Sequence, residues 1–210
     1  MPHPEREDLD LVAWLARSRE RGFLGPMPIA EQVRHACGMA IALGVVPSDV
    51  VDLGSGGGVP GFVLARLVWP DARWHFVESS ARRVAFLNEA QEALGLDGRV
   101  TVWHGRAEEA GRDVGLRHSV DLVVARSFGA PAVTAECAAP FLRTGGVVLV
   151  SEPPGDRSAQ RWPPAGLAQL DLRLEAAQAE PVHVVVLRST GACADRYPRR
   201  VGIPAKRPLF

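Results

Sequence analysis

The spacing of apolar residues divides the chain into a helical start and a longer alternating section. In residues 1–47, apolar side chains recur every three or four positions on both sides of a Gly/Pro-rich break, which predicts two amphipathic helices. From residue 48 onward, short apolar runs alternate with stretches of helical periodicity. The predicted strands are residues 50–53, 73–78, 100–103, 120–125 and 146–151, and the predicted helices are residues 8–19, 29–43, 60–67, 81–94 and 130–142. Strands that alternate with helices indicate βαβ units, and hence an α/β fold with a doubly wound, mostly parallel sheet.

The alternation stops after residue 151. Residues 152–164 are rich in proline, glycine and charge and predict a loop. Apolar residues within 167–174 and 182–187 predict two strands that pair as an antiparallel hairpin at the sheet edge. Residues 190–210 mix prolines, glycines and basic residues and predict an extended tail. The predicted organisation is a helical cap (1–47), a central α/β domain (48–189) and a basic C-terminal tail (190–210).

The composition excludes several classes of protein. The chain has 210 residues, of which 47% are hydrophobic, and equal numbers of acidic and basic residues, so it is neither disordered nor a polycation. Its three scattered cysteines predict no disulfide framework and no metal site. The acidic N-terminus lacks the apolar core of a signal peptide, and no apolar run is long enough to span a bilayer. We therefore expect a cytoplasmic protein without membrane contact, with a monomer as the favoured oligomeric state.

The zero net charge is a cancellation between two parts of the chain. Residues 188–210 contain six basic residues and one acidic residue, for a charge of +5, so the remaining residues carry −5. Lys206 is the one lysine among 24 basic residues, and it lies in this basic segment. Arginine binds phosphates and base edges in a bidentate manner better than lysine does. Any contact with nucleic acid is therefore expected to be local.

A cluster of glycines between the first central strand and the next helix is the strongest functional signal. The predicted cofactor-binding residues in this segment are Asp52, Gly54, Ser55, Gly56, Gly58, Pro60 and Gly61. Glycines without side chains let the backbone approach a ligand closely, next to a helix N-terminus. The spacing formally matches a dinucleotide fingerprint, and it also matches the acidic-first loop of S-adenosylmethionine (AdoMet) methyltransferases. Asp52 favours AdoMet, because a carboxylate repels a pyrophosphate and attracts the cationic amino-acid end of AdoMet.

Two further segments extend the predicted nucleoside pocket. Glu78 ends the second central strand, where a carboxylate accepts hydrogen bonds from both ribose hydroxyls, and Ser79 follows it. Arg106, Ala107 and Glu108 follow the third strand, where backbone groups would meet the adenine edge. A dehydrogenase with a Tyr-x-x-x-Lys proton relay is excluded, because the chain has one tyrosine and one lysine, at distant positions.

These residues together resemble a known family. The similar segments are Arg21 to Pro26, Arg34-His35, Asp52 to Gly56, Pro60-Gly61, Glu78, Arg83, Phe86-Leu87, Arg106 to Glu109 and Arg126. They resemble the RsmG (GidB) family of bacterial methyltransferases, which act on guanine N7 of small-subunit ribosomal RNA. The resemblance covers about residues 20–150. It implies AdoMet as the cofactor and ribosomal RNA or the small ribosomal subunit as the partner.

The acceptor chemistry and the resemblance indicate further site residues. Guanine N7 has a free lone pair and no proton to remove, so positioning can account for catalysis and no general base is expected. We predict that Arg126 is a cofactor-binding residue that also orients the base or a phosphate, and that Phe128 offers a stacking surface, with an internal ion pair and a core packing role as the respective alternatives. The predicted RNA contacts are Arg34, His35, Arg83, Arg199, Arg200, Lys206 and Arg207. For His35 a structural hydrogen bond is the alternative, and for the tail an arrangement wrapped on the core.

The chain departs from the family pattern after the last parallel strand. The family usually carries a Lys-Gly pair there, whereas this sequence reads Ser151-Glu152 followed by two prolines. A methyltransferase for a small molecule or another acceptor therefore stays open. A non-catalytic nucleotide-binding or RNA-binding module is the alternative from a different functional class.

Overall fold

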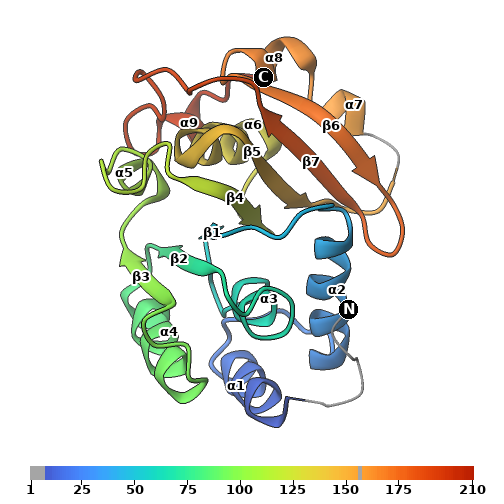
Figure 1. Ribbon diagram of the computed structural model, residues 1–210, viewed down its shortest axis with the longest axis vertical. Helices are drawn as coiled ribbons and strands as arrows, with labels where there is room; N and C mark the ends of the chain where they lie inside the picture. Colours follow the sequence, from blue (N-terminus) through green and yellow to red (C-terminus); the bar gives the residue numbers. More distant parts are fainter. Residues whose placement is uncertain (1–7, 156–157) are drawn as a thin grey trace.

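The computed structural model describes residues 8–155 and 158–210, and its centre is a seven-stranded sheet in the order β3-β2-β1-β4-β5-β7-β6 (Figure 1). The strands are β1 (Asp49–Leu53), β2 (Arg73–Glu78), β3 (Val100–His104), β4 (Val120–Ala125), β5 (Leu142–Ser151), β6 (Leu172–Gln178) and β7 (Val184–Ser189). Strands β1 to β5 are parallel, and β7 runs antiparallel to both β5 and β6. The predicted α/β class with an antiparallel hairpin at the sheet edge is confirmed.

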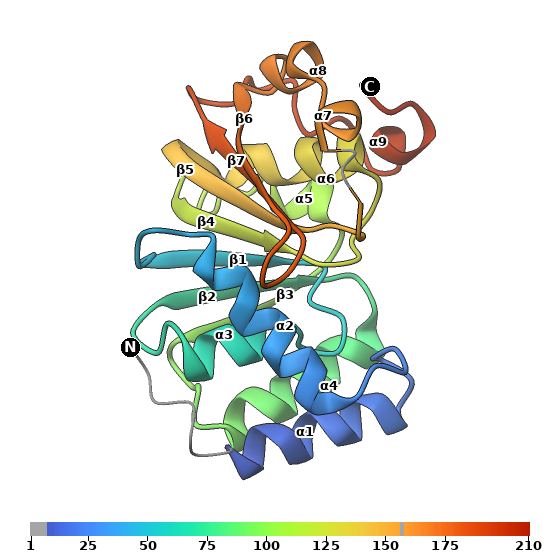
Figure 2. The ribbon, with the colours of Figure 1, turned by 90° about the vertical axis from the view of Figure 1, so that its right-hand side faces the viewer.

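Helices cover both faces of the sheet (Figure 2). They are α1 (Leu9–Glu20), α2 (Ile29–Ile41), α3 (Gly61–Leu67), α4 (Ala81–Ala93), α5 (Ala107–Ala110), α6 (Pro131–Ala138), α7 (Ser158–Arg161), α8 (Pro164–Ala168) and α9 (Ile203–Lys206). Helices α1 to α4 pack on one face, and α5, α6 and α8 pack on the other. Adjacent residues of β1 therefore enter different cores: Val50 belongs to the first and Val51 to the second. This follows from the alternation of side chains along a strand. None of the described helices is both long and apolar enough to cross a membrane.

Two predicted elements differ from the structure at prolines. The helix expected over 130–142 ends at Ala138 and continues as a 3-10 turn through Pro140, so that β5 begins at Leu142. Proline inside a helix removes a donor and clashes with the preceding turn, which explains the early end. The strand expected over 167–174 begins only at Leu172, because Pro164 opens the short helix α8 that buries Leu167.

The prediction that residues 190–210 form an extended tail is wrong. Tyr197 and Pro198 are buried against the second core, and the segment ends in α9 beside α6. Arg117 donates to the carbonyl oxygens of Tyr197 and Cys193, each at 2.9 Å. The C-terminal segment, meaning residues 190–210 from here on, is therefore a folded part of the second helical layer.

The glycine loop is packed tightly on the first helical layer. A Cβ atom on Gly61 would meet the carboxylate of Asp52 and the ring of Phe76, so no side chain fits there. Gly57 faces Ser18 of α1 and Leu24 of the connection between α1 and α2 in the same way. The predicted cap is thus in direct contact with the loop, and α1 and α2 complete the layer formed by α3 and α4.

We expect Gly61→Ala to lower the free energy of unfolding by about 1–3 kcal/mol, because the new methyl group overpacks the space between Asp52 and Phe76. Gly44→Ala is the matched control, since nothing lies within 4 Å of a Cβ at that position. Its effect should stay within about 0.5 kcal/mol. Urea denaturation of both variants measures the difference, and equal losses would contradict this packing.

Candidate functional site

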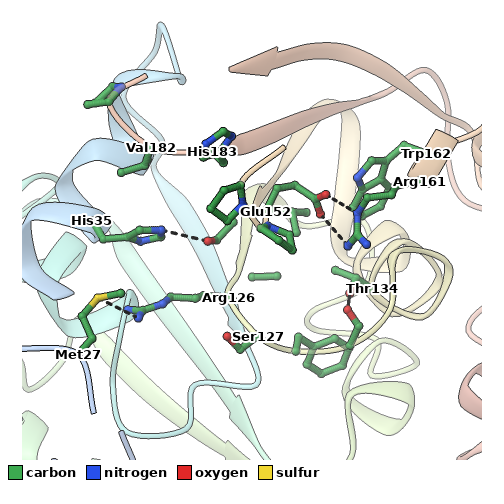
Figure 3. A pocket seen from close by; sticks show the side chains of 18 residues that line it. Met27, His35, Arg126, Ser127, Thr134, Glu152, Arg161, Trp162, Val182 and His183 are labelled. Atoms are coloured by element: carbon green, nitrogen blue, oxygen red, sulfur yellow. Dashed lines mark hydrogen bonds and ion pairs between the residues drawn. The ribbon is translucent and has the colours of Figure 1, made fainter. Parts of the chain in front are cut away.

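Three adjoining cavities lie where the carboxyl ends of the parallel strands meet. The central cavity, of about 440 Å³, is lined by residues after β1, β2, β3 and β4, among them Gly54, Glu78, Arg106 and Phe128. The loop recess, of about 180 Å³, is lined by Gly54 to Gly57 together with Phe23, Arg83 and Arg126. The outer cavity, of about 560 Å³, lies between β4, β5, α2 and the β6–β7 turn (Figure 3). Carboxyl ends of parallel strands are where α/β proteins place their ligands.

The backbone of the glycine loop forms the floor between the central cavity and the loop recess. Gly54, Gly56 and Gly58 have φ of +73°, +56° and +91°, a region that other residues adopt only with strain. The N–H groups of Gly54 and Ser55 both donate to the carbonyl oxygen of Val77, at 2.9 and 3.1 Å, which ties the loop to β2. The predicted loop residues Gly54, Ser55 and Gly56 therefore line the cavities.

The other predicted residues of this segment, Asp52, Gly58, Pro60 and Gly61, line none of the three cavities. The side chain of Asp52 is 1% exposed, and its Oδ2 accepts a hydrogen bond of 3.2 Å from the Gly61 N–H. Its Oδ1 has no hydrogen-bond partner among the described residues. Burial raises the pKa of Asp52 to about 7, and the Gly61 hydrogen bond offsets this only in part. This carboxylate supports the loop from behind instead of lining the cavity.

Glu78 lines the central cavity at the end of β2, as predicted, and also holds the loop. Its Oε2 accepts from the Gly56 N–H at 2.9 Å, and its Oε1 accepts from the Ser80 N–H at 2.8 Å. A carboxylate has about four acceptor positions, so both oxygens keep capacity for hydroxyl groups. Arg83 Nη1 lies 3.8 Å from Glu78 Oε2, and Arg83 lines both the central cavity and the loop recess. The predicted RNA contact at Arg83 is therefore part of the cavity wall, as is Ser79.

Arg106, Ala107 and Glu108 also line the central cavity, at the start of α5. The carboxylate of Glu108 is buried, and its Oε1 accepts from the Gly202 N–H at 2.9 Å. The side chain of Glu108 is thus directed to the C-terminal segment. The central cavity has one more wall that sequence reasoning missed, because Ala205 of α9 also lines it.

Arg126 lies where the loop recess meets the outer cavity. Its side chain is half-buried, and its Nη1 is fully buried without a hydrogen-bond partner. Within the described part of the chain, no carboxylate lies within 4.0 Å of the guanidinium, so the described residues do not support the alternative of an internal ion pair. Burial lowers the pKa of Arg126, although a guanidinium stays charged. A buried cation without a counter-ion is costly, and a bound anion or carbonyl oxygen would satisfy it.

Phe128 separates the central cavity from the outer cavity and lines both. Its ring packs on the backbone of Gly54, where a Cβ would come within 2.6 Å of Cδ2. Ser127, at a φ of +55°, provides the turn that directs the chain from β4 to this position. The half-buried ring touches the second core and also borders the two cavities.

His35 of α2 points into the outer cavity on the same side as Arg126 (Figure 3). Its Nε2 lies 3.2 Å from Ser151 Oγ, and its Nδ1 is buried without a partner. Burial, and next the charge of Arg126, lower the pKa of His35, so the ring is neutral at pH 7. The histidine therefore has a structural hydrogen bond to β5 and one free ring nitrogen.

The far wall of the outer cavity contains an ion pair, between Arg161 and Glu152, that the sequence did not reveal. Arg161 Nε donates to Glu152 Oε2 at 2.6 Å, and the carboxylate is almost completely buried (Figure 3). Trp162 and His183 complete this wall. The departure from the Lys-Gly pattern thus places an acid in the cavity, where Arg161 neutralises it. No local signal connects positions 152 and 161.

Apart from Arg83, which belongs to the cavity wall, the predicted RNA-contact cations fall into two groups. Arg34, Arg200, Lys206 and Arg207 are exposed, Arg34 with 71% of its side chain accessible. Arg199 instead donates from Nε and Nη2 to the buried carboxylate of Glu136, at 2.8 and 2.6 Å. This ion pair occupies the guanidinium of Arg199 and holds the C-terminal segment to α6, so its donors are directed to Glu136.

A parallel sheet with an acidic-first glycine loop after β1 and a buried carboxylate at the end of β2 defines the class I AdoMet-dependent methyltransferase fold. The fold is similar to an O-methyltransferase from Bacillus cereus solved with SAH (TM-score 0.59, 14% identity, 89% of this chain and 93% of that one). It is also similar to a methyltransferase from Geobacter sulfurreducens (TM-score 0.59, 18% identity, 90% and 91%).

Sequence comparison identifies the family within this class. The sequence model described as "GidB: rRNA small subunit methyltransferase G" matches residues 34–162. The chain is 38% identical to ribosomal RNA small subunit methyltransferase G of Synechococcus sp. (strain RCC307) over 78% of this chain and 71% of that protein. It is 33% identical to the protein of the same name from Moorella thermoacetica, over 80% and 73%. The chain belongs to the GidB family of small-subunit rRNA methyltransferases.

The raised pKa of Asp52 predicts a pH dependence of stability. Between about pH 4 and pH 7 the folded state keeps a proton that the unfolded state has released. The contribution of this carboxyl to the free energy of unfolding is therefore complete below pH 4 and is lost as the pH rises through 7. Relative to Asp52→Asn, which cannot ionise, the unfolding free energy of the wild type should fall by on the order of 3 kcal/mol between pH 4 and pH 8.

Urea denaturation at a series of pH values measures this difference. Asp97→Asn is the control, because Asp97 is exposed and its substitution should leave the pH curve unchanged. If the free energy of unfolding depended on pH in the same way for the wild type and Asp52→Asn, ionisation of Asp52 would not destabilise the folded state, and the prediction would be wrong.

Proposed function

We propose that this protein transfers the methyl group of AdoMet to N7 of a guanine in small-subunit ribosomal RNA. Arg126 is the observation that carries the proposal, because it is a half-buried guanidinium at the junction of the loop recess and the outer cavity, and no carboxylate among the described residues pairs with it. Family membership supports the same activity, since the relatives are named as methyltransferases of small-subunit ribosomal RNA.

The central cavity and the loop recess fit AdoMet. Glu78 would accept hydrogen bonds from the ribose hydroxyls, and the backbone at Ala107 would meet the adenine edge. The glycine backbone leaves room that a side chain would fill, and the unpartnered Oδ1 of Asp52 lies below it. Once Asp52 is ionised, above its pKa of about 7, its negative charge would favour the cationic amino-acid end of AdoMet through the loop or through water. When bound, AdoMet supplies the activated methyl group.

The outer cavity would hold the acceptor base. Its Arg126 can donate to the O6 of guanine or to a phosphate, and Phe128 can stack on the base between the two cavities. N7 carries no proton, so the residues need to align it without removing one. The neutral His35, bonded to Ser151, suits a positioning role in such a site.

A second candidate is methylation of a small molecule or another acceptor. The Glu152–Arg161 pair favours it, because this wall carries an acid where the family usually places Lys-Gly. A wall whose arginine is already paired with an acid attracts RNA phosphates less than a wall with a free lysine would. The two candidates share the cofactor site and differ in the acceptor.

The proposal is tested by incubating the protein with labelled AdoMet and with small ribosomal subunits that lack N7-methylguanine, followed by chemical cleavage at N7-methylguanine. We expect label in the ribosomal RNA at a cleavable guanine. AdoMet binding without label in RNA would support another acceptor, and a lack of AdoMet binding would support a non-catalytic module. Binding of NAD(P) would instead support a dehydrogenase.

In the same assay, Arg126→Ala should lower methyl transfer by at least tenfold while calorimetry shows AdoMet binding close to that of the wild type. Removing the guanidinium deletes donors that orient the acceptor and leaves the ribose contacts intact. Arg19→Ala is the control, because Arg19 is an exposed arginine on α1 outside the three cavities. Unchanged turnover in Arg126→Ala would remove this residue from the mechanism.

The exposed cations Arg200, Lys206 and Arg207 are proposed to contact RNA phosphates, together with Arg34 on α2. The triple variant Arg200→Ala/Lys206→Ala/Arg207→Ala should bind RNA more weakly. The slope of log K against log salt should become shallower by about 0.7–0.9 for each phosphate that the variant no longer neutralises. Fluorescence titration at several salt concentrations measures the slope. An unaltered slope would exclude the C-terminal segment from the RNA interface.

A further inference from the structure

The C-terminal segment borders the central cavity through Ala205 of α9, on the side of α5 and α6. This segment lies outside residues 34–162, which the family model matches. We propose that the C-terminal segment is a structural part of the cofactor site and completes the pocket for the adenine ring. The identity of the ligand rests on the proposed function, whereas the wall that the C-terminal segment adds to the central cavity rests on contacts within the fold.

The residues around Ala205 form an apolar surface of small side chains. Ala107, Ala130, Val133 and Cys137 line the same cavity and come from α5, from α6 and from the turn before α6. A flat purine ring fits such a surface, while Glu78 offers polar acceptors at the other end of the cavity. The arrangement thus gives the adenosine part of AdoMet an apolar end and a polar end.

An ion pair to a fully buried carboxylate ties the C-terminal segment to α6. Glu136 is 0% exposed, and its Oε1 accepts from both the backbone N–H and the Nε of Arg199, each at 2.8 Å. Its Oε2 accepts from Arg199 Nη2 at 2.6 Å. Without the segment, this carboxylate would be a buried charge without a partner, which is strongly unfavourable. Helix α6 also supplies Val133 and Cys137 to the cavity, so its position depends on Arg199.

A second buried carboxylate ties the segment to α5. Glu108 lines the central cavity, and its Oε1 accepts from the N–H of Gly202, the residue that precedes α9 at a φ of +78°. Two arginines after α5 add further anchors: Arg112 donates to the carbonyl oxygen of Pro198, and Arg117 donates to that of Tyr197. Both helices that bear the apolar wall are therefore held by the C-terminal segment.

A large side chain at position 205, which would fill the space beside the wall, tests the proposal directly. Ala205 is exposed at the cavity edge, so Ala205→Trp should fold and should place an indole ring in the space for adenine. We expect AdoMet affinity to fall at least tenfold by calorimetry, with an unchanged melting temperature. Val201→Trp is the matched control, because Val201 is exposed in the same segment and lines none of the three cavities, and this variant should bind AdoMet like the wild type.

In the methylation assay, Ala205→Trp should raise the KM for AdoMet and recover most of the wild-type kcat at saturating AdoMet, a split that general destabilisation would not produce. Arg199→Met should also weaken AdoMet binding, and the double variant Glu136→Met/Arg199→Met, which has no unpaired charge, should recover part of it. Wild-type AdoMet affinity in Ala205→Trp would overturn the proposal. Failure of label transfer to RNA would overturn the proposed acceptor and leave this inference standing, provided that AdoMet binds.

Discussion

The hydrogen bond from the Gly61 N–H to Asp52 Oδ2 constrains the glycine loop, and the cofactor side of the site depends on that loop. It joins the end of β1 to the start of α3, so the residues between them must reverse direction within a few positions. Positive φ angles at Gly54, Gly56 and Gly58 allow the turn. The constraint has a cost, which is a buried carboxylate with one oxygen unpartnered and a raised pKa. Such a cost is typical of a binding site and unusual in a scaffold.

Local patterns predicted the elements that local forces determine. Strands β2 and β4 begin and end at the expected residues, because each is a buried apolar run bounded by turn signals. The glycine loop was predictable for the same reason: its chemistry lies within twelve consecutive residues. Long-range partners were not predictable. Ser151 and His35 are 116 positions apart, and Arg199 and Glu136 are 63 apart. A sequence shows the charge of Arg199 and not its partner. The composition of the C-terminal segment alone therefore did not distinguish an anchored segment from a solvated tail.

The arginines of this chain divide by whether the fold supplies a partner. Arg199 and Arg161 each meet a buried carboxylate, and these pairs hold the C-terminal segment and the wall of the outer cavity. Arg126 meets no carboxylate in the part of the chain that the structure describes, although its Nη1 is buried. The fold could satisfy a guanidinium at this depth with an acid, as it does elsewhere. Leaving Arg126 without one keeps a directed set of donors available for a ligand, which is how preorganised sites gain selectivity.

The distribution of charge constrains how such a protein could approach RNA. Attraction over long distances is weak for a chain of zero net charge, because exposed charges are screened beyond about 8 Å at physiological ionic strength. The acid in the wall of the outer cavity is neutralised by Arg161, so that wall neither attracts nor strongly repels a phosphate. Affinity for RNA would then have to come from close contacts at the exposed cations of α2 and the C-terminal segment. Because Ala205 lies directly beside Lys206, the surface that contacts the RNA backbone and the wall of the cofactor pocket would belong to the same short helix.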